Sequence, residues 1–425
     1  MGARIPRFSP SFSLAEAWIS IRHLVPLGDE ASEVADFEAE FADYIGTRHA
    51  VMVPSARYGF YLLLKAWGWG PGDEIILPAL TYFAIPALAK TAGCTPVFAD
   101  IGETSHVLDP AAFEAAITPQ TRAVVPTHLF GTPCDMDAIR EIAAAHDIRV
   151  IEDCAQSTGA RWQGSRVGSL GDAAYYTFGL TKNITTLSGA MITTGNDTVA
   201  ASVREAMDQV RPGSLWKATQ EALTGTAMMF ATHPWIYPWT LHPVIVLGNQ
   251  VGKDPIHDRF GETPRTYPEL PDRYLSAGPR GMQAAVGRKQ LQRIESLNSA
   301  RAANGRFLDE ALAHVPGLVT PTYPAGGEPI YMSFVVHHDQ RDELATALRG
   351  LGVDTTVGYM SNCADSDLFP EERATCPRAA HAMANLLHIP VHPNLSPSRL
   401  DHIAEATRQA CLEIQPQSGQ PRYTR

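Results

Sequence analysis

Short apolar runs alternate with amphipathic segments between about residues 48 and 195. This alternation predicts repeated strand–helix–strand units, in which helices cover both faces of a parallel sheet. The chain is therefore expected to have an α/β fold with a mostly parallel central sheet flanked by helices. The expected strands are 74–78, 96–100, 123–127, 149–152, 173–178 and 190–194. The expected helices between them are 57–67, 85–92, 110–116 and 136–146.

The pattern changes beyond residue 195, where a strand is expected at 331–337 and helices at 199–210, 282–311, 340–351 and 398–412. The elements after residue 255 predict a second, smaller α/β domain. The chain then divides into an N-terminal arm (1–30), a large domain (31–255) and a small C-terminal domain (256–425). The length of 425 residues agrees with this division, because single hydrophobic cores stop growing near roughly 250–300 residues.

Composition excludes several kinds of partner and site. The chain is 45% hydrophobic, as expected of a soluble globular protein with a large core. Its net charge is −11 and its basic residues are scattered, so a nucleic-acid partner is not expected. The six cysteines form no C-x-x-C pair, which predicts neither a metal site nor a disulfide framework. Without a signal-peptide pattern at the N-terminus, we expect a cytoplasmic location.

Two polar residues lie at the ends of predicted strands. Asp153 follows the apolar run 149–152, and Lys182 lies in a polar loop just after the strand 173–178. The carboxyl edge of a parallel sheet is where open α/β folds bind ligands, so both side chains are expected to face one pocket. A lysine and an acid in one pocket suit pyridoxal phosphate: the lysine forms a Schiff base with the cofactor, and the acid pairs with the pyridine nitrogen. Lys182 would then move the substrate Cα proton as general base and acid.

Several ordered blocks surround these two residues. They are Glu152-Asp153-Cys154-Ala155-Gln156, Gly171-Asp172, Thr177-Phe178 with Lys182, Thr81-Tyr82-Phe83-Ala84 and His128-Leu129-Phe130-Gly131. Together they resemble the DegT/DnrJ/EryC1/StrS family of aminotransferases, closely over about residues 30–200 and again at 283–287. The resemblance implies a fold-type I pyridoxal phosphate enzyme that works as a homodimer with its sites at the subunit interface.

The resemblance also implies roles for individual residues. Lys182 matches the lysine that binds the cofactor, and Asp153 matches the partner of the pyridine nitrogen. Gln156 matches a polar neighbour of the cofactor ring, and Tyr82 matches the aromatic side chain that stacks on it. Thr177 replaces the usual serine and keeps a hydroxyl for the phosphate.

Other positions depart from the family pattern. Ala56 and Arg57 lie where the phosphate-binding helix begins, and free backbone N–H groups at a helix start suit a dianion. Arg57 replaces a small hydroxyl residue, so it is expected to bind either the phosphate or a substrate carboxylate, or to form a structural ion pair. The family commonly has Gly-Glu-Gly-Gly after the lysine, and this chain has Leu187-Ser188-Gly189-Ala190 at that place. Ser276 stands where an asparagine commonly reaches across the dimer, and these changes indicate a divergent branch.

His128 has two interpretations. It either lies near the substrate, or it is a buried histidine whose ring nitrogens are bonded within the fold. The sequence leaves both open.

Residues 222–252 contain no Asp, Glu, Lys or Arg. Prolines interrupt this stretch repeatedly, so a spanning helix of about 20 apolar residues is not expected. Two interpretations remain. The stretch either packs at the dimer interface or under the small domain, or it inserts Trp235, Tyr237 and Trp239 into the headgroup region of a membrane. The second interpretation would place the protein peripherally on the inner membrane face.

These observations predict a pyridoxal phosphate-dependent aminotransferase. By family resemblance the amino donor is L-glutamate and the acceptor is a keto sugar linked to a nucleotide. A rival prediction is transamination of a lipid-linked or long-chain keto substrate at a membrane surface. A third is a regulatory relative that holds the cofactor without turnover.

Overall fold

A seven-stranded sheet forms the centre of the computed structural model, which describes residues 4–23, 29–250 and 277–414. The strand order is β1-β10-β9-β6-β5-β2-β4. These strands are β1 (His49–Val53), β2 (Glu74–Pro78), β4 (Thr95–Ala99), β5 (Thr121–Val124), β6 (Arg149–Asp153), β9 (Ala173–Thr177) and β10 (Ala190–Thr194). Five of them run parallel from β9 to β4, whereas β10 is antiparallel to both β9 and β1. The predicted α/β fold with a mostly parallel sheet is confirmed.

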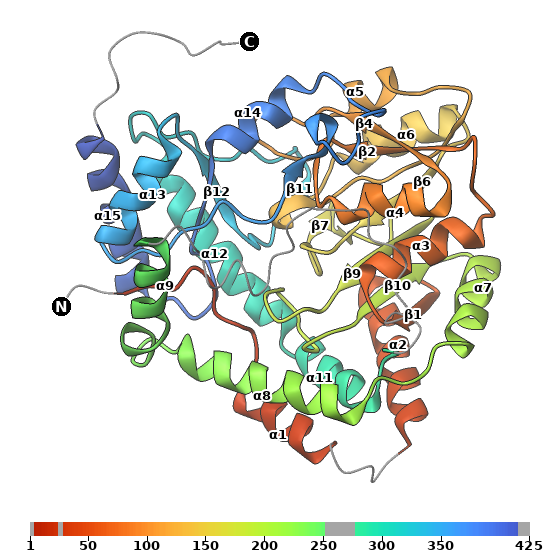
Figure 1. The fold of residues 1–425 in the computed structure, drawn as a ribbon, viewed down its shortest axis with the longest axis horizontal. Coiled ribbons are helices and arrows are strands. Elements are labelled where there is room, and N and C mark those ends of the chain that lie inside the picture. Colours follow the sequence, from red (N-terminus) through yellow and green to blue (C-terminus); the bar gives the residue numbers. More distant parts are fainter. Residues whose placement is uncertain (1–3, 24–28, 251–276, 415–425) are drawn as a thin grey trace.

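Helices cover both faces of this sheet (Figure 1). Those that follow its strands are α3 (Ala56–Ala66), α4 (Ala84–Ala92), α5 (Pro110–Ala115), α6 (Met136–Ala145) and α7 (Asp197–Asp208). Neighbouring residues of β2 point to opposite faces: Ile75 and Leu77 join a cluster with α3 and α7, and Ile76 joins a cluster with α5 and α6. Both faces of the central strands are therefore buried, which explains their continuous apolar runs.

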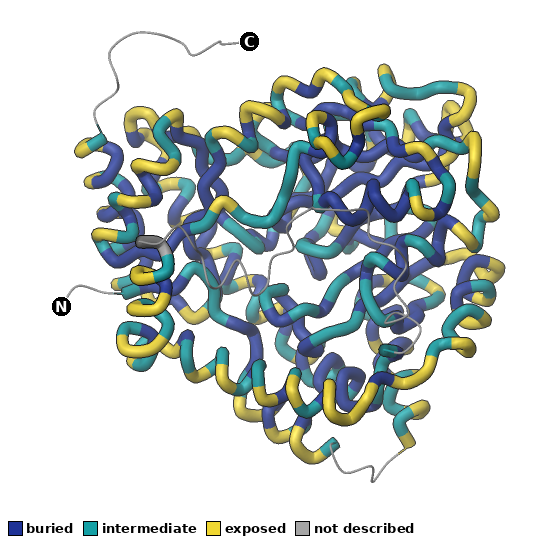
Figure 2. The backbone as a smooth tube through the Cα atoms, viewed as in Figure 1, coloured by how far each residue is buried: buried dark blue, intermediate teal, exposed yellow. Residues whose placement is uncertain are grey.

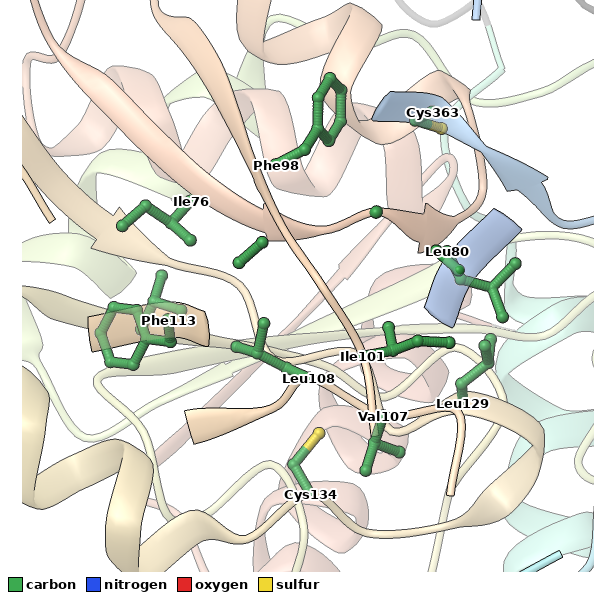
Figure 3. Close-up of a cluster of buried hydrophobic side chains, with 14 of the residues drawn as sticks. Ile76, Leu80, Phe98, Ile101, Val107, Leu108, Phe113, Leu129, Cys134 and Cys363 are labelled. Carbon is green, nitrogen blue, oxygen red and sulfur yellow. The ribbon is translucent and has the colours of Figure 1, made fainter. Parts of the chain in front are cut away.

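The cluster around Ile76 joins the sheet to the C-terminal part of the chain. In Figure 3, Phe113 lies near Ile76 on one side of the cluster, and Leu129 lies beside Ile101 and Leu80 on the other side. Cys363 belongs to the same cluster. Leu80 belongs to the short strand β3 (Leu80–Thr81), which pairs with β13 (Ser361–Asn362). This contact places residues just before β13 beside the carboxyl edge of the main sheet.

The helix predicted at 282–311 is two helices, α11 (Gly281–Leu291) and α12 (Ile294–Leu312). Gln292 and Arg293 separate them, and Arg293 binds the buried carboxylate of Glu16 at 2.8 Å. α11 packs on α2 (Glu30–Ile45), whereas α12 runs on to the C-terminal part and packs on α15 (Pro397–Glu413). Because of this break, the segment 281–312 packs on the N-terminal helix α2 with its first half and on the C-terminal helix α15 with its second half.

The C-terminal part has its own hydrophobic cluster around Phe334 and Ile389. These residues lie on the antiparallel strands β12 (Phe334–His337) and β14 (Leu386–Ile389). The remaining elements of this part are β11 (Gly327–Glu328), α13 (Arg341–Gly350), η4 (Cys363–Asp365) and α14 (Pro377–Asn385). β11 pairs with β7 (Arg161–Trp162), which in turn pairs with β8 (Ser165–Arg166).

The uncharged stretch is largely helical. It includes most of α8 (Leu215–Ala231), the short η2 (Tyr237–Trp239) and α9 (Leu241–Gln250). Through all the described ranges, each helix is too short or too polar to cross a bilayer. α8 packs beside α1 (Leu14–Arg22), and both lie at the lower edge of the view in Figure 1. The expected domain boundary at residue 256 and Ser276 both lie outside the described residues.

Candidate active site

A cavity of about 580 Å³ opens at the carboxyl edge of the main sheet. Ser55, Thr127, Asp153 and Thr177 lie on its wall, and each ends or follows one of the strands β1, β5, β6 and β9. The sequence-predicted residues that line it are Ala56, Arg57, Tyr82, Asp153, Gln156, Thr177 and Lys182. The sheet thus brings together side chains that are more than 120 positions apart in the chain.

Asp153 is the last residue of β6, and 4% of its surface is exposed. Burial raises the pKa of its carboxyl group above the ordinary value. The strongest of the groups that act in the opposite direction, by favouring the charged form, are the backbone N–H of Ala155, which donates at 3.0 Å, the Tyr175 hydroxyl and the Lys182 ammonium. Such a carboxylate is best satisfied by a cationic or N–H donor group entering from the cavity.

Lys182 lies in the tight turn after β9, where its backbone N–H donates to Gly179 at 3.0 Å. Because protein surrounds the ammonium group, burial lowers the pKa of Lys182 to about 8, although the charge of Asp153 offsets part of this effect. A substantial fraction of the lysine is therefore unprotonated slightly above neutral pH. A free amine is the form that attacks a carbonyl carbon.

Helix α3 begins at the wall of the same cavity. Ser55 caps it, and its hydroxyl oxygen accepts from the N–H of Tyr58 at 3.2 Å. Ala56 and Arg57 form the first turn and line the cavity. First-turn N–H groups have no partner inside their own helix, and the helix dipole favours an anion at this end. The start of α3 is therefore suited to a phosphate group.

Gln156, Tyr82 and Thr177 complete this side of the cavity. The Gln156 side-chain oxygen accepts from the backbone N–H of Phe130 at 3.0 Å, which holds the amide in place. Phe130 has a φ of 57°, a left-handed conformation that is rare for a non-glycine residue. A backbone N–H thus holds the Gln156 amide on the cavity wall that Asp153 also lines.

His128 does not line the cavity. Its ring is completely buried, with one nitrogen accepting from the N–H of Cys134 and the other donating to Glu152, both at 3.0 Å. Glu152 also accepts from the N–H groups of Gly168, Leu170 and Gly171. The structure therefore favours the second interpretation of His128, a histidine bonded within the fold.

His128, Glu152 and Cys154 place one potential metal-ligand atom each within 4.8 Å of one another. Both ring nitrogens of His128 are already engaged, as described above. Burial raises the pKa of the Cys154 thiol well above its ordinary value, so the thiolate that a metal needs is disfavoured. This cluster is a buried hydrogen-bonded group beneath the cavity.

Sequence reasoning missed an entire wall of the cavity. Helix α8 contributes Lys217, Gln220, Glu221 and Thr224, whose spacing of three and four residues places them on one helix face. Glu221 accepts from the Ser188 hydroxyl at 2.9 Å and from the Gln283 amide at 3.3 Å. The spacing of the polar residues Lys217, Glu221 and Thr224 in the sequence indicates a polar face on this helix. It does not indicate that this face lines the cavity.

A glycine allows α8 to approach the body of the protein. A Cβ atom at Gly225 would lie 2.4 Å from Leu187 and 3.5 Å from Phe12. Leu187 lines the cavity, so α8 closes the site by direct contact. Tyr359 and Met360, which precede β13, contribute a further part of the wall.

The groups on the cavity wall fit pyridoxal phosphate. An amine with a lowered pKa suits the aldehyde, a buried carboxylate suits the pyridine nitrogen, and a helix start suits the phosphate. All three belong to one cavity. Fold and site together define an α/β enzyme built around this cofactor.

Comparisons with known proteins agree with this conclusion. The model of the DegT/DnrJ/EryC1/StrS aminotransferase family matches residues 27–230 and 280–408. The spore coat polysaccharide biosynthesis protein SpsC of Bacillus subtilis is 30% identical over 93% of this chain and 92% of its own. The dTDP-3-amino-3,4,6-trideoxy-alpha-D-glucose transaminase of Streptomyces venezuelae is 32% identical over 89% and 86%. The chain belongs to the DegT/DnrJ/EryC1/StrS aminotransferase family.

A solved structure leads to the same result. DesV of S. venezuelae matches with a TM-score of 0.76 at 29% identity, over 97% of this chain and 100% of that chain. The protein is accordingly a pyridoxal phosphate-dependent aminotransferase.

Proposed function

We propose that this enzyme transfers an amino group from L-glutamate to the keto group of a nucleotide-linked sugar. The proposal is carried by the pairing of Lys182 and Asp153 in a cavity that also contains the start of α3. The acceptor class is supported by relatives whose names specify nucleotide-sugar amination, such as the transaminase of S. venezuelae described above and the GDP-perosamine synthase of Caulobacter vibrioides.

Pyridoxal phosphate, when bound, supplies the electron sink for the bonds that change at the substrate carbon. Asp153 would keep the pyridine nitrogen protonated, because its carboxylate is buried on the wall of the cavity. Lys182 would hold the cofactor and then move a proton to and from the reacting carbon. Its pKa of about 8 suits both directions of that transfer near neutral pH.

The remaining residues on the wall would position the cofactor and substrates. The start of α3 and the hydroxyl of Thr177 would hold the phosphate, Tyr82 would stack on the ring, and Gln156 would bond near it. Arg57 would bind the phosphate or the donor carboxylate, for which its planar guanidinium is suited. We propose that the enzyme acts as a homodimer, as its family resemblance implies.

The test separates the two half-reactions. Purified enzyme with pyridoxal phosphate should be yellow and should bleach when L-glutamate is added, because the donor converts the cofactor to its amine form. Nucleotide-linked keto sugars are then added one at a time to the bleached enzyme. The yellow colour should return with those sugars that accept the amino group. Colour that persists with every amino donor would contradict an aminotransferase of this type and favour the regulatory relative.

A second candidate acceptor is a lipid-linked or long-chain keto compound. The observation that favours it is that α8 lines the cavity with Glu221 and also carries the exposed Trp216. The same screen decides between the candidates when it includes a long-chain keto substrate in detergent micelles. If the colour returned with that substrate alone, the acceptor would be a long-chain keto compound and not a nucleotide-linked sugar.

A further inference from the structure

Helix α1 exposes an apolar stripe to solvent. Leu14, Trp18 and Ile21 are 67, 66 and 53% exposed, and their spacing of four and three residues places them on one side of the helix. The opposite side, with Ala17 and Ser20, is buried. Helices on globular proteins usually turn their apolar side inward, so α1 has an additional apolar side that needs an explanation.

Helix α8 repeats this arrangement. Trp216, Leu223 and Phe230 are 71, 65 and 48% exposed and follow one another at intervals of seven residues. Ala218 and Ala222 are buried against the body of the protein. α8 therefore has three sides: one packs, one lines the cavity, and one presents large apolar side chains outward.

The turn after α8 presents two tryptophans. Trp235 and Trp239 are 83 and 72% exposed, whereas Tyr237 between them is completely buried. The Tyr237 hydroxyl lies 3.3 Å from the carboxylate of Asp354, which also forms a buried ion pair with Arg7 at 2.8 Å. Tyr237 is thus an anchor and not a contact residue, which corrects the predicted membrane trio of Trp235, Tyr237 and Trp239. The anchor holds the two indoles outward.

We define the apolar face as the exposed side chains of α1, α8, η2 with its flanking turn, and α9. Its members are Leu14, Trp18, Ile21, Trp216, Leu223, Phe230, Trp235, Trp239, Val244 and Leu247. These elements lie along the lower and left margin of the molecule, where Figure 2 shows many exposed positions. With roughly 150–250 Å² for each aromatic side chain, the four indoles alone expose about 400 Å² or more. Apolar surface of this extent usually marks an interaction site.

The charges on the same elements are one-sided. Glu16 is completely buried and Glu221 faces the cavity, so both acids of α1 and α8 point inward. Lys217 lines the cavity and lies 3.9 Å from Glu221, so the exposed charged residue on the outward sides of the described α1, α8, η2 and α9 is Arg22. The chain as a whole carries a net charge of −11. A face with a cation and without exposed carboxylates on such an acidic protein complements an anionic surface.

We propose that the apolar face docks the enzyme on an anionic lipid bilayer. Indole side chains are favoured in the headgroup region, and the nearby Arg22 adds attraction to anionic lipids. A second copy of this chain is a poorer occupant. In a twofold contact the face would meet itself, and Arg22 would find no exposed carboxylate on the same elements of the partner. Docking would also place the α8 wall of the cavity about one helix diameter, roughly 10 Å, from the lipid surface.

The test is flotation of the purified full-length holoenzyme with vesicles of phosphatidylcholine containing 30% phosphatidylglycerol. We expect most of the wild type to float with these vesicles, and less with phosphatidylcholine alone. The variant Trp235→Ser/Trp239→Ser should float at least about fivefold less. The variant Trp18→Ser/Trp216→Ser tests the two helices independently of the turn and should show a similar loss.

The matched control removes exposed apolar surface elsewhere. Leu412 and Val319 are 74 and 50% exposed and lie outside the four elements, so Leu412→Ser/Val319→Ser should float like the wild type. Cofactor absorbance and the unfolding midpoint confirm that each variant is folded. The readout needs no acceptor, so it is independent of the proposed reaction.

Two results would overturn the proposal. One is wild type that stays at the bottom of the gradient with anionic vesicles at low salt, and the other is equal flotation of the wild type and both tryptophan variants. Sedimentation velocity then identifies the alternative occupant. A wild type that does not float but forms a larger assembly than its tryptophan variants would make the face a contact between protein copies.

Discussion

Asp153 and Lys182 face one cavity from neighbouring parallel strands, and each charge offsets part of the other's desolvation. Burial nevertheless dominates for both residues: it raises the pKa of the acid and lowers the pKa of the amine. The protein itself therefore offsets only part of the desolvation penalty of these two charged groups. A ligand that places a cation against Asp153 and a carbonyl carbon near Lys182 relieves both groups.

Replacing Lys182 by Ala should abolish turnover while the fold stays intact. The amine is the group that would hold the cofactor and move the proton, so we expect a loss of at least about 10³-fold. Turnover is measured with L-glutamate and the acceptor from the screen, and folding is measured by circular dichroism. Lys289→Ala is the control, because the Lys289 amine bonds to Gln292 on the outer side of α11. Substantial turnover by Lys182→Ala would show that another amine does this chemistry.

Lys182→Met should stabilise the cofactor-free protein near neutral pH. The folded-state pKa of about 8 lies below the unfolded value of 10.5, so folding opposes the charged form. The penalty is complete below pH 8 and disappears as pH rises from 8 to 10.5, because there the folded state has released the proton and the unfolded state has not. The difference between a pKa of 10.5 and one of about 8 corresponds to at most about 3.5 kcal/mol.

Urea unfolding of the cofactor-free wild type and Lys182→Met from pH 7 to 10.5 measures the difference between their free energies of unfolding. This difference should be largest at pH 7 and should approach zero toward pH 10.5. A gap that is constant over this range would mean that the ionisation of Lys182 does not set the difference.

His128→Leu should destabilise the protein without changing substrate affinity. The substitution removes the side-chain donor to Glu152 and the acceptor for the N–H of Cys134, both in the interior. We expect a loss of about 3 kcal/mol in the free energy of unfolding. His146→Leu, at the exposed end of α6, should change stability by only about 0.5 kcal/mol. A raised KM with unchanged stability would instead place His128 at the substrate.

Tyr237→Ala and Trp235→Ala should differ sharply in stability, although the residues are two positions apart. Tyr237 is completely buried and contacts Asp354, so its removal should cost about 3–5 kcal/mol. Trp235 is 83% exposed, so its removal should cost about 0.5 kcal/mol or less. Thermal unfolding of both variants measures the difference. Equal losses would mean that the turn is not held by Tyr237.

Much of the sheet and part of the site follow from local pattern. The strands at 74–78 and 190–194 coincide with β2 and β10, and the helices at 85–92 and 110–116 differ from α4 and α5 by one residue at one end. The strand β1 was missed, although its short run His49–Val53 forms one edge of the sheet. The break between α11 and α12 was also missed, because Gln292 and Arg293, which lie between the two helices, are not turn-forming residues.

The sequence alone determined the α/β class, the family and the candidate residues Asp153 and Lys182, because strand periodicity and strand-end chemistry are local properties of the chain. Only the tertiary structure decided that α8 closes the cavity with Lys217 and Glu221. It also decided that Tyr237 points inward while the neighbouring tryptophans point outward. The physical reason is that the burial of a side chain depends on which distant segments pack against it, and an uncharged stretch contains no local signal for that choice.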